Sequence, residues 1–151
     1  MSEEMITLAI ALRLGLSVLV GGLIGLNRDL AHKPAGVRTH ALVSLGTALM
    51  VIVVMPVGED DAHRYDALSR VIQGVLTGIG FLGAGVILRD PEMRHVSGLT
   101  TAATIWLTAL LGVACGAGLY VPVFITMLLG GLVVTFGGRI ERALHKDPPV
   151  E

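Results

Sequence analysis

The stretch MITLAIALRLGLSVLVGGLIGL, residues 5–26, decides the fold class of this chain. Its 22 positions hold one ionisable residue, Arg13. A helix crosses the hydrocarbon core of a bilayer with about 20 predominantly apolar residues. Four more stretches have the same character, and they cover residues 39–57, 67–88, 98–115 and 118–138. Because a spanning backbone must satisfy its own polar groups, the sequence predicts an all-α bundle of five transmembrane helices.

The composition agrees with a membrane domain. Over 151 residues, 53% are hydrophobic and 15% charged, and the mean hydropathy is +0.77. We expect one five-span domain, residues 1–140, followed by a short cytoplasmic tail, residues 141–151. A net charge of −1 suggests no nucleic-acid partner. Cys115 is the only cysteine, so an intramolecular disulfide is excluded.

The basic residues of the connections predict the orientation. If alternate connections face the same side, eight lysines and arginines gather on one side and two on the other. The first group is Arg28, Lys33, Arg38, Arg89, Arg94, Arg139, Arg142 and Lys146, and the second is Arg64 and Arg70. The positive-inside rule then places the N-terminus outside and the C-terminus in the cytoplasm.

Glycine is frequent in this chain, with 20 residues. Three G-x-x-x-G pairs lie inside spans, namely Gly21 with Gly25, Gly74 with Gly78, and Gly112 with Gly116. Lipid tails give helices no hydrophobic drive to associate, so small residues that let backbones approach supply packing energy. The pairs therefore predict either helix packing inside one chain or a face for a homodimer or a partner helix.

Arginines at membrane depth leave two interpretations open. Arg13 could reach outward to water or project into a polar cavity. Arg28, Arg38 and Arg89 lie at the predicted cytoplasmic ends of three spans, where they either anchor the protein in the membrane or form a functional cluster. Asp29 and Asp90 follow two of them, so local ion pairs would neutralise part of such a cluster.

The sequence gives little support for enzymatic or metal chemistry. No span carries Asp or Glu near its middle, which counts against a dehydrated magnesium pathway. His40 lies in the second predicted span and Cys115 in the fourth, and nothing in their spacing joins them into a dyad. We therefore expect a protein that is not an enzyme and that holds no metal ion or cofactor.

The chain carries five distinctive motifs, which are GLNRD (25–29), PAGVRTH (34–40), GIGFLGAGVI (78–87), GLTTAAT (98–104) and CGAG (115–118). Together these motifs resemble the MgtC/SapB family of bacterial inner-membrane proteins. The resemblance implies candidate functional residues at matching positions, which are Arg28, Gly36, Arg38, Thr39, Gly80, Gly83, Gly85, Arg89, Gly98, Thr101 and Cys115.

The same resemblance implies a function. Family members look like five-span proteins, often with a soluble C-terminal domain, and some serve virulence and growth at low magnesium. One restrains the proton-translocating ATP synthase, which makes another membrane protein the expected partner. This chain departs from the family pattern at Asn27, which stands in place of a glutamate, and at Ser97, which stands in place of a basic residue.

Two functions remain open on the sequence. The first is a non-enzymatic regulator that binds another membrane protein through its glycine-rich faces and a basic cytoplasmic rim. The second is a transporter or channel whose cytoplasmic mouth is lined by Arg28, Arg38 and Arg89. A polar cavity that converges on these arginines would favour transport, whereas a closed core beside an exposed groove would favour regulation.

Overall fold

The computed structural model describes residues 2–55, 64–89 and 96–144, and this part of the chain is a bundle of five helices. Each helix is long and apolar enough to cross a bilayer, which confirms the predicted fold class. The helices are α1 (Glu3–Leu30), α2 (Val37–Val54), α3 (Arg64–Val86), α4 (Leu99–Ala117) and α5 (Tyr120–Leu144).

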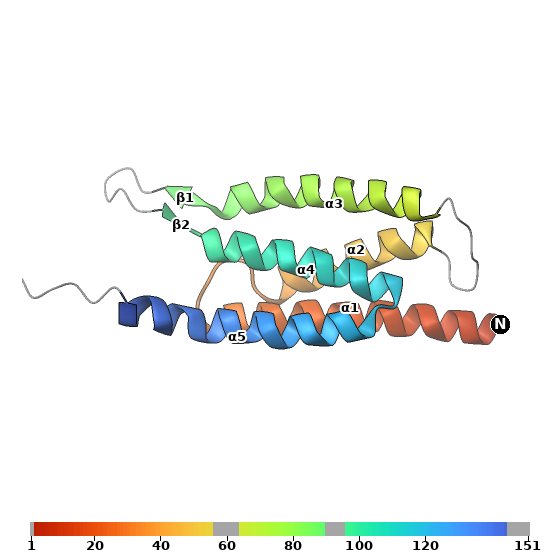
Figure 1. Cartoon of the computed structure of the whole chain (residues 1–151), viewed down its shortest axis with the longest axis horizontal. Helices are drawn as coiled ribbons and strands as arrows, with labels where there is room; N and C mark the ends of the chain where they lie inside the picture. Colours follow the sequence, from red (N-terminus) through yellow and green to blue (C-terminus); the bar gives the residue numbers. More distant parts are fainter. Residues whose placement is uncertain (1, 56–63, 90–95, 145–151) are drawn as a thin grey trace, which may run out of the picture.

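Helix α4 is the centre of the bundle (Figure 1). It packs against α1, α2 and α3, and α1 and α2 also pack closely against each other. Helix α3 lies on one side of α4, and α1 and α5 lie on the other (Figure 1). Because α5 makes few contacts with α4 and α1, most of its surface faces outward.

Two glycine pairs hold the centre of the bundle together. A Cβ on Gly25 would lie 2.6 Å from the Gly36 carbonyl oxygen, and Gly21 packs on the carbonyl of His40, so α1 and α2 meet backbone to backbone. Gly112 and Gly116 place α4 against α2 in the same way. In these four positions the absent side chain is what permits the helices to approach.

The third pair, Gly74 and Gly78, behaves differently. Both residues are exposed, and a Cβ on either would meet no described atom within 4 Å. At these two positions an added Cβ would therefore touch no other described helix. This differs from the interpretation in which all three pairs pack helices inside one chain. The same spacing leads to packing in α1 and α4 because those helices are central, whereas α3 is peripheral.

The turn between α4 and α5 explains the position of Arg13. Gly118 has φ +76, and the N–H groups of Gly118 and Leu119 donate to the carbonyls of Cys115 and Ala114, which is a Schellman C-cap. Arg13 Nη1 donates to the Gly116 carbonyl oxygen at 2.9 Å. The arginine thus binds the C-terminal end of α4, where the helix dipole is negative, and it stays partly exposed.

A short hairpin that the sequence analysis did not predict joins α3 to α4. Strand β1 (Leu88–Arg89) pairs antiparallel with β2 (Val96–Ser97), and Leu88 lies opposite Ser97. Two residues a side are too few to produce an alternating pattern that sequence reasoning can detect. The hairpin leads the chain directly into α4.

Two apolar clusters form the core. One contains Val20, Leu111, Cys115 and Val123. The other contains Val75, Ile79, Ile105 and Ala109, and it fixes α3 on α4. Trp106 is 45% exposed, because it lies on the face of α4 that these clusters leave uncovered.

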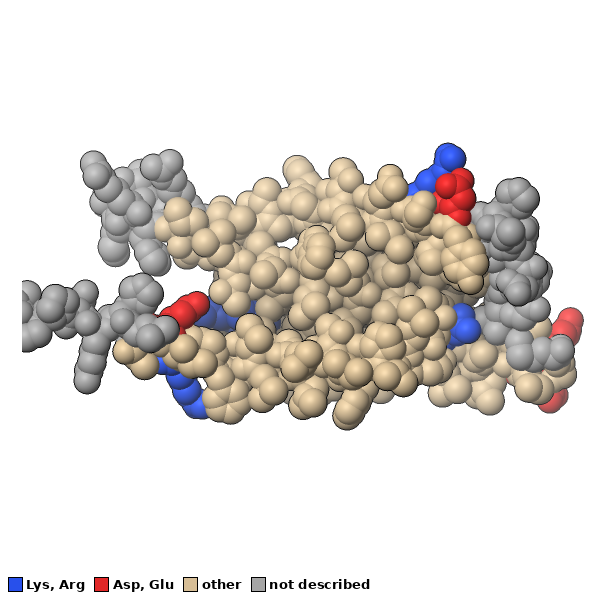
Figure 2. Space-filling model, in the orientation of Figure 1, with Lys and Arg blue, Asp and Glu red and all other residues tan. Residues whose placement is uncertain are grey.

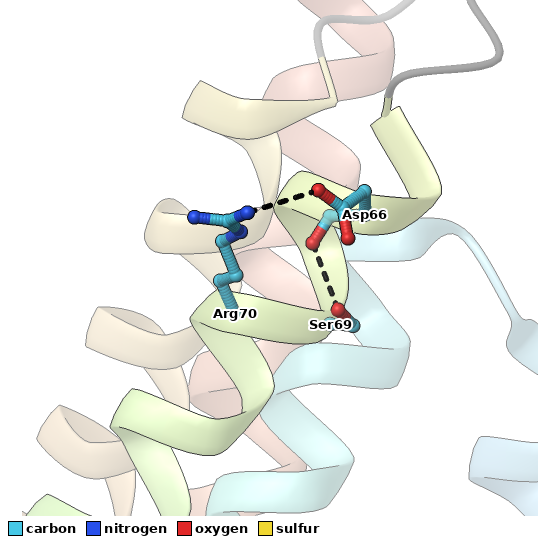
Figure 3. Close-up of polar contacts among 3 residues, drawn as sticks. All are labelled: Asp66, Ser69 and Arg70. Carbon is cyan, nitrogen blue, oxygen red and sulfur yellow. Dashed lines mark hydrogen bonds and ion pairs between the residues drawn. The ribbon is translucent and has the colours of Figure 1, made fainter.

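On the face shown in Figure 2, charged side chains gather near the two ends of the molecule, and the surface between them carries no charged residue. At the start of α3, Arg70 and Asp66 form an exposed ion pair of 3.3 Å, and Ser69 donates to the Asp66 carbonyl oxygen (Figure 3). An exposed pair at this spacing contributes little to stability. An uncharged belt between charged ends, formed by helices of high hydropathy, fits a protein that crosses a bilayer.

Candidate functional site

Arg28 is buried, although a basic rim would require it to be exposed. Its side chain is 4% exposed, and its Nη2 donates to Thr101 Oγ1 at 2.7 Å. Its Nε is also buried, and no described residue accepts a hydrogen bond from it. An ionisable group held in this way inside a membrane protein usually has a function, because its burial is costly.

His40 and Thr104 lie in the same buried region. His40 Nδ1 is 3.0 Å from the Gly36 carbonyl oxygen, and its Nε2 is 3.3 Å from Thr104 Oγ1. Since a carbonyl only accepts, Nδ1 carries a hydrogen in this geometry. Thr104 in turn donates to the Thr101 carbonyl oxygen at 2.9 Å.

We call Arg28, His40, Thr101 and Thr104 the polar cluster. Its members come from α1, α2 and α4, so three helices meet at polar side chains close to the end of the bundle that is predicted to be cytoplasmic. Arg28 and Thr101 were predicted as candidate residues from the sequence, whereas His40 and Thr104 were not. Both missed residues lie in the quoted motifs, which was the available signal.

Asp29 stabilises the connection between α1 and α2, and it forms no described ion pair with its neighbour Arg28. Its Oδ2 accepts from the Val37 N–H at 2.9 Å, at the first turn of α2. The carboxylate lies directly against Gly36, so a side chain at that position would collide with it. Among the described contacts Asp29 therefore forms no ion pair with Arg28, because the N-terminus of α2 holds this carboxylate.

The remaining candidate residues are dispersed. Arg38 and Thr39 are exposed at the start of α2, whereas Cys115 is fully buried in the core. Gly83 is buried against Ala102, and Arg89 belongs to β1, with its side chain outside the described part. Gly80 and Gly85 have open space beside them, as do Gly74 and Gly78.

Helix α3 turns its small and polar residues outward. We call this surface the outer α3 face, and its residues are all exposed: Gln73, Gly74, Thr77, Gly78, Gly80, Phe81, Ala84 and Gly85. Val75, Ile79 and Gly83, on the opposite side of the helix, are buried against the bundle. Helix α3 also exposes the large apolar residues Phe81 and Leu82. Small residues such as those of the outer α3 face are typical of helix–helix interfaces in membranes.

An apolar groove runs beside this face, between α2 and α3. Its volume is about 440 Å³, and its lining is Leu42, Val43, Gly46, Thr47, Met50, Val71, Gly74, Val75, Gly78, Ile79 and Leu82. A second cavity of about 210 Å³ lies between α1, α4 and α5, with Asn27, Thr104 and Thr126 as its polar lining residues. Neither is lined by an arginine among the described residues.

The fold and its apolar helices define a multi-pass α-helical membrane protein. Residues 14–143 match the MgtC family, and the chain belongs to that family.

Named relatives agree. The chain is 48% identical to protein SrpB of Synechococcus elongatus over 80% of this chain and 72% of SrpB. It is 36% identical to protein SapB of Bacillus subtilis, over 91% of this chain and 60% of SapB. It is 42% identical to protein MgtC of Salmonella typhimurium, over 78% of this chain and 48% of that MgtC. The chain thus spans about half to three quarters of the length of these relatives, and no solved structure matches it.

Proposed function

We propose that this chain is a non-enzymatic membrane protein that acts by binding another membrane protein, and that the outer α3 face is its binding surface. The observation that carries the proposal is the orientation of α3, which buries Val75 and Ile79 and exposes glycine, alanine, threonine and glutamine beside Phe81 and Leu82.

The chemistry of this face suits a transmembrane helix as the partner. A Cβ placed on Gly74 or Gly78 would have no described atom within 4 Å, so a partner backbone can approach closely. Gln73 lies near the middle of α3, and its side-chain amide forms no hydrogen bond with a described residue. In a bilayer such an amide gains from a polar group on a neighbouring helix.

The adjoining groove extends the same surface. Gly74 and Gly78 belong both to the outer α3 face and to the groove between α2 and α3. Large apolar side chains of a partner helix can enter the groove while its backbone crosses the glycines. An exposed apolar groove beside a closed core is the arrangement that favours regulation over transport.

The arrangement of the arginines also supports regulation. A permeation mouth requires arginines around an open polar pathway, but Arg28 is buried against Thr101 and the two cavities are largely apolar. Of the predicted basic rim, Arg38 is exposed and available for a partner.

The cellular role and the membrane are inferred from family membership, and the orientation from the distribution of basic residues. We infer a regulator in the bacterial inner membrane, with the N-terminus outside, that serves adaptation to low magnesium and virulence. The partner would be a membrane complex such as the ATP synthase, and a second copy of this chain is the alternative occupant of the outer α3 face.

Gly78→Leu is expected to release the partner without damage to the fold. The Cβ of the leucine meets no described atom within 4 Å, so the thermal midpoint in mild detergent should equal that of the unaltered protein. The amount of co-purified membrane protein should fall about tenfold, because the leucine side chain separates the two packed helices. Co-purification from mildly solubilised membranes, quantified by mass spectrometry, measures this.

Gly15→Leu is the matched control, because Gly15 is also exposed and open but lies on α1. It should retain the partner. Equal retention by both variants, or rapid ion flux through the purified unaltered protein in liposomes, would contradict the proposal.

A further inference from the structure

The first turn of α4 has donors that no described residue uses. Gly98 is the N-cap residue, with φ +91, and it offers no side-chain acceptor. The backbone N–H groups of Leu99, Thr100 and Thr101 form no hydrogen bond with the described residues. The first N–H groups of a helix have no partner inside it, and the helix dipole makes this end positive.

Arg28 brings a fixed positive charge to the same turn. Its guanidinium donates to the hydroxyl of Thr101, the third residue of α4, at 2.7 Å. Only 4% of the residue is exposed, and its Nε–H has no described acceptor. A buried guanidinium with an unused N–H is unfavourable, and an anion that accepts from this N–H and balances the charge relieves the cost.

No described carboxylate fills that role. Asp29, the neighbouring acid, accepts from the Val37 N–H at the start of α2. The described ion pair between Arg70 and Asp66 lies at the other end of α3. Leu99 and Thr100 are exposed, so the turn is open to its surroundings.

We infer that the N-terminal turn of α4 and the Arg28 guanidinium form a binding site for a phosphate-type oxyanion. A tetrahedral oxyanion accepts several hydrogen bonds at once, from backbone N–H groups at a helix N-terminus and from the planar guanidinium. The shared chemistry is a phosphate group, which either a phospholipid headgroup or free inorganic phosphate supplies. This site is separate from the outer α3 face.

The test measures binding of inorganic phosphate to delipidated protein in detergent by calorimetry. We expect saturable binding that Arg28→Gln weakens about tenfold or more, as the loss of charge-assisted hydrogen bonds implies. Arg38→Gln, which removes an exposed charge at the same end of the bundle, should change the affinity less than about twofold. Absence of saturable binding, or equal weakening by both variants, would overturn the inference unless the lipid measurement succeeds.

The lipid measurement identifies the source of the phosphate group. Protein exposed to phosphatidylglycerol vesicles is analysed by native mass spectrometry, and retained lipid that depends on Arg28 assigns the site to a headgroup. Thr101→Val keeps the side-chain shape but removes the hydroxyl that fixes the guanidinium, so it should weaken either ligand several-fold even if Arg28→Gln does not fold. If neither phosphate nor lipid binds, or if both bind Thr101→Val unchanged, the inference is wrong.

Discussion

Replacement of Gly25 or Gly116 by alanine is expected to prevent stable assembly of the bundle. A Cβ on Gly25 would lie 2.6 Å from the Val37 nitrogen, and one on Gly116 would lie 2.5 Å from the Ala48 carbonyl oxygen and 2.9 Å from Val51 Cβ. Overpacking usually costs about 1–3 kcal/mol and sometimes more. The upper part of this range applies, because the colliding atoms are mainly backbone and a whole helix must move.

The thermal midpoint in mild detergent and the yield of monodisperse protein measure this effect. Gly78→Ala is the matched control, since a Cβ at that position meets no described atom within 4 Å. We expect an unchanged midpoint for Gly78→Ala and loss of folded protein for the other two. Similar midpoints for all three variants would show that the contacts between α1, α2 and α4 differ from those described.

The second large effect is expected at Gly98. Gly98 and Gly118 both have positive φ, at +91 and +76, and asparagine tolerates this region better than other side chains do. Conformation alone would therefore predict similar effects for Gly98→Asn and Gly118→Asn. The surroundings differ, because a Cβ on Gly98 would lie 2.9 Å from the Val86 carbonyl carbon, whereas one on Gly118 would meet the flexible end of Arg13.

We expect Gly98→Asn to lose most of its folded protein and Gly118→Asn to lose little. Backbone strain and overpacking together cost about 2–5 kcal/mol at Gly98, which is a large part of the stability of a small domain. Limited proteolysis and thermal unfolding in detergent compare the two variants. Equal stability would mean that the end of α3 does not pack on Gly98.

The number and type of the helices could be predicted because bilayer thickness constrains an apolar stretch directly. Residues 5–26 were predicted to span, and α1 (Glu3–Leu30) contains them with additional residues at both ends. Those ends carry charged residues such as Glu3 and Arg28, so hydropathy alone placed the boundaries too far inside.

The candidate site could be predicted only in part, because sequence does not show which side of a helix meets a neighbour. Gly21 with Gly25 and Gly74 with Gly78 have identical spacing, but only at the first pair would an added Cβ meet another described helix. Likewise, Arg28 and Arg38 both lie near helix ends, yet one is buried and the other exposed. Such differences arise from tertiary packing, which brings Thr101 of α4 to Arg28.

The central claim is that the outer α3 face contacts another membrane protein in the living cell. A photo-crosslinking amino acid at Thr77 places a reactive group on that face. The same group at Leu19, which is 64% exposed on α1, samples a surface to which we assign no partner. Irradiation of intact cells, followed by purification and mass analysis of adducts, compares the two positions.

We predict a protein adduct of discrete mass from Thr77 that is lost when Gly78→Leu is added, and lipid adducts alone from Leu19. Lipid adducts alone from Thr77, or the same protein adduct from both positions, would contradict the account.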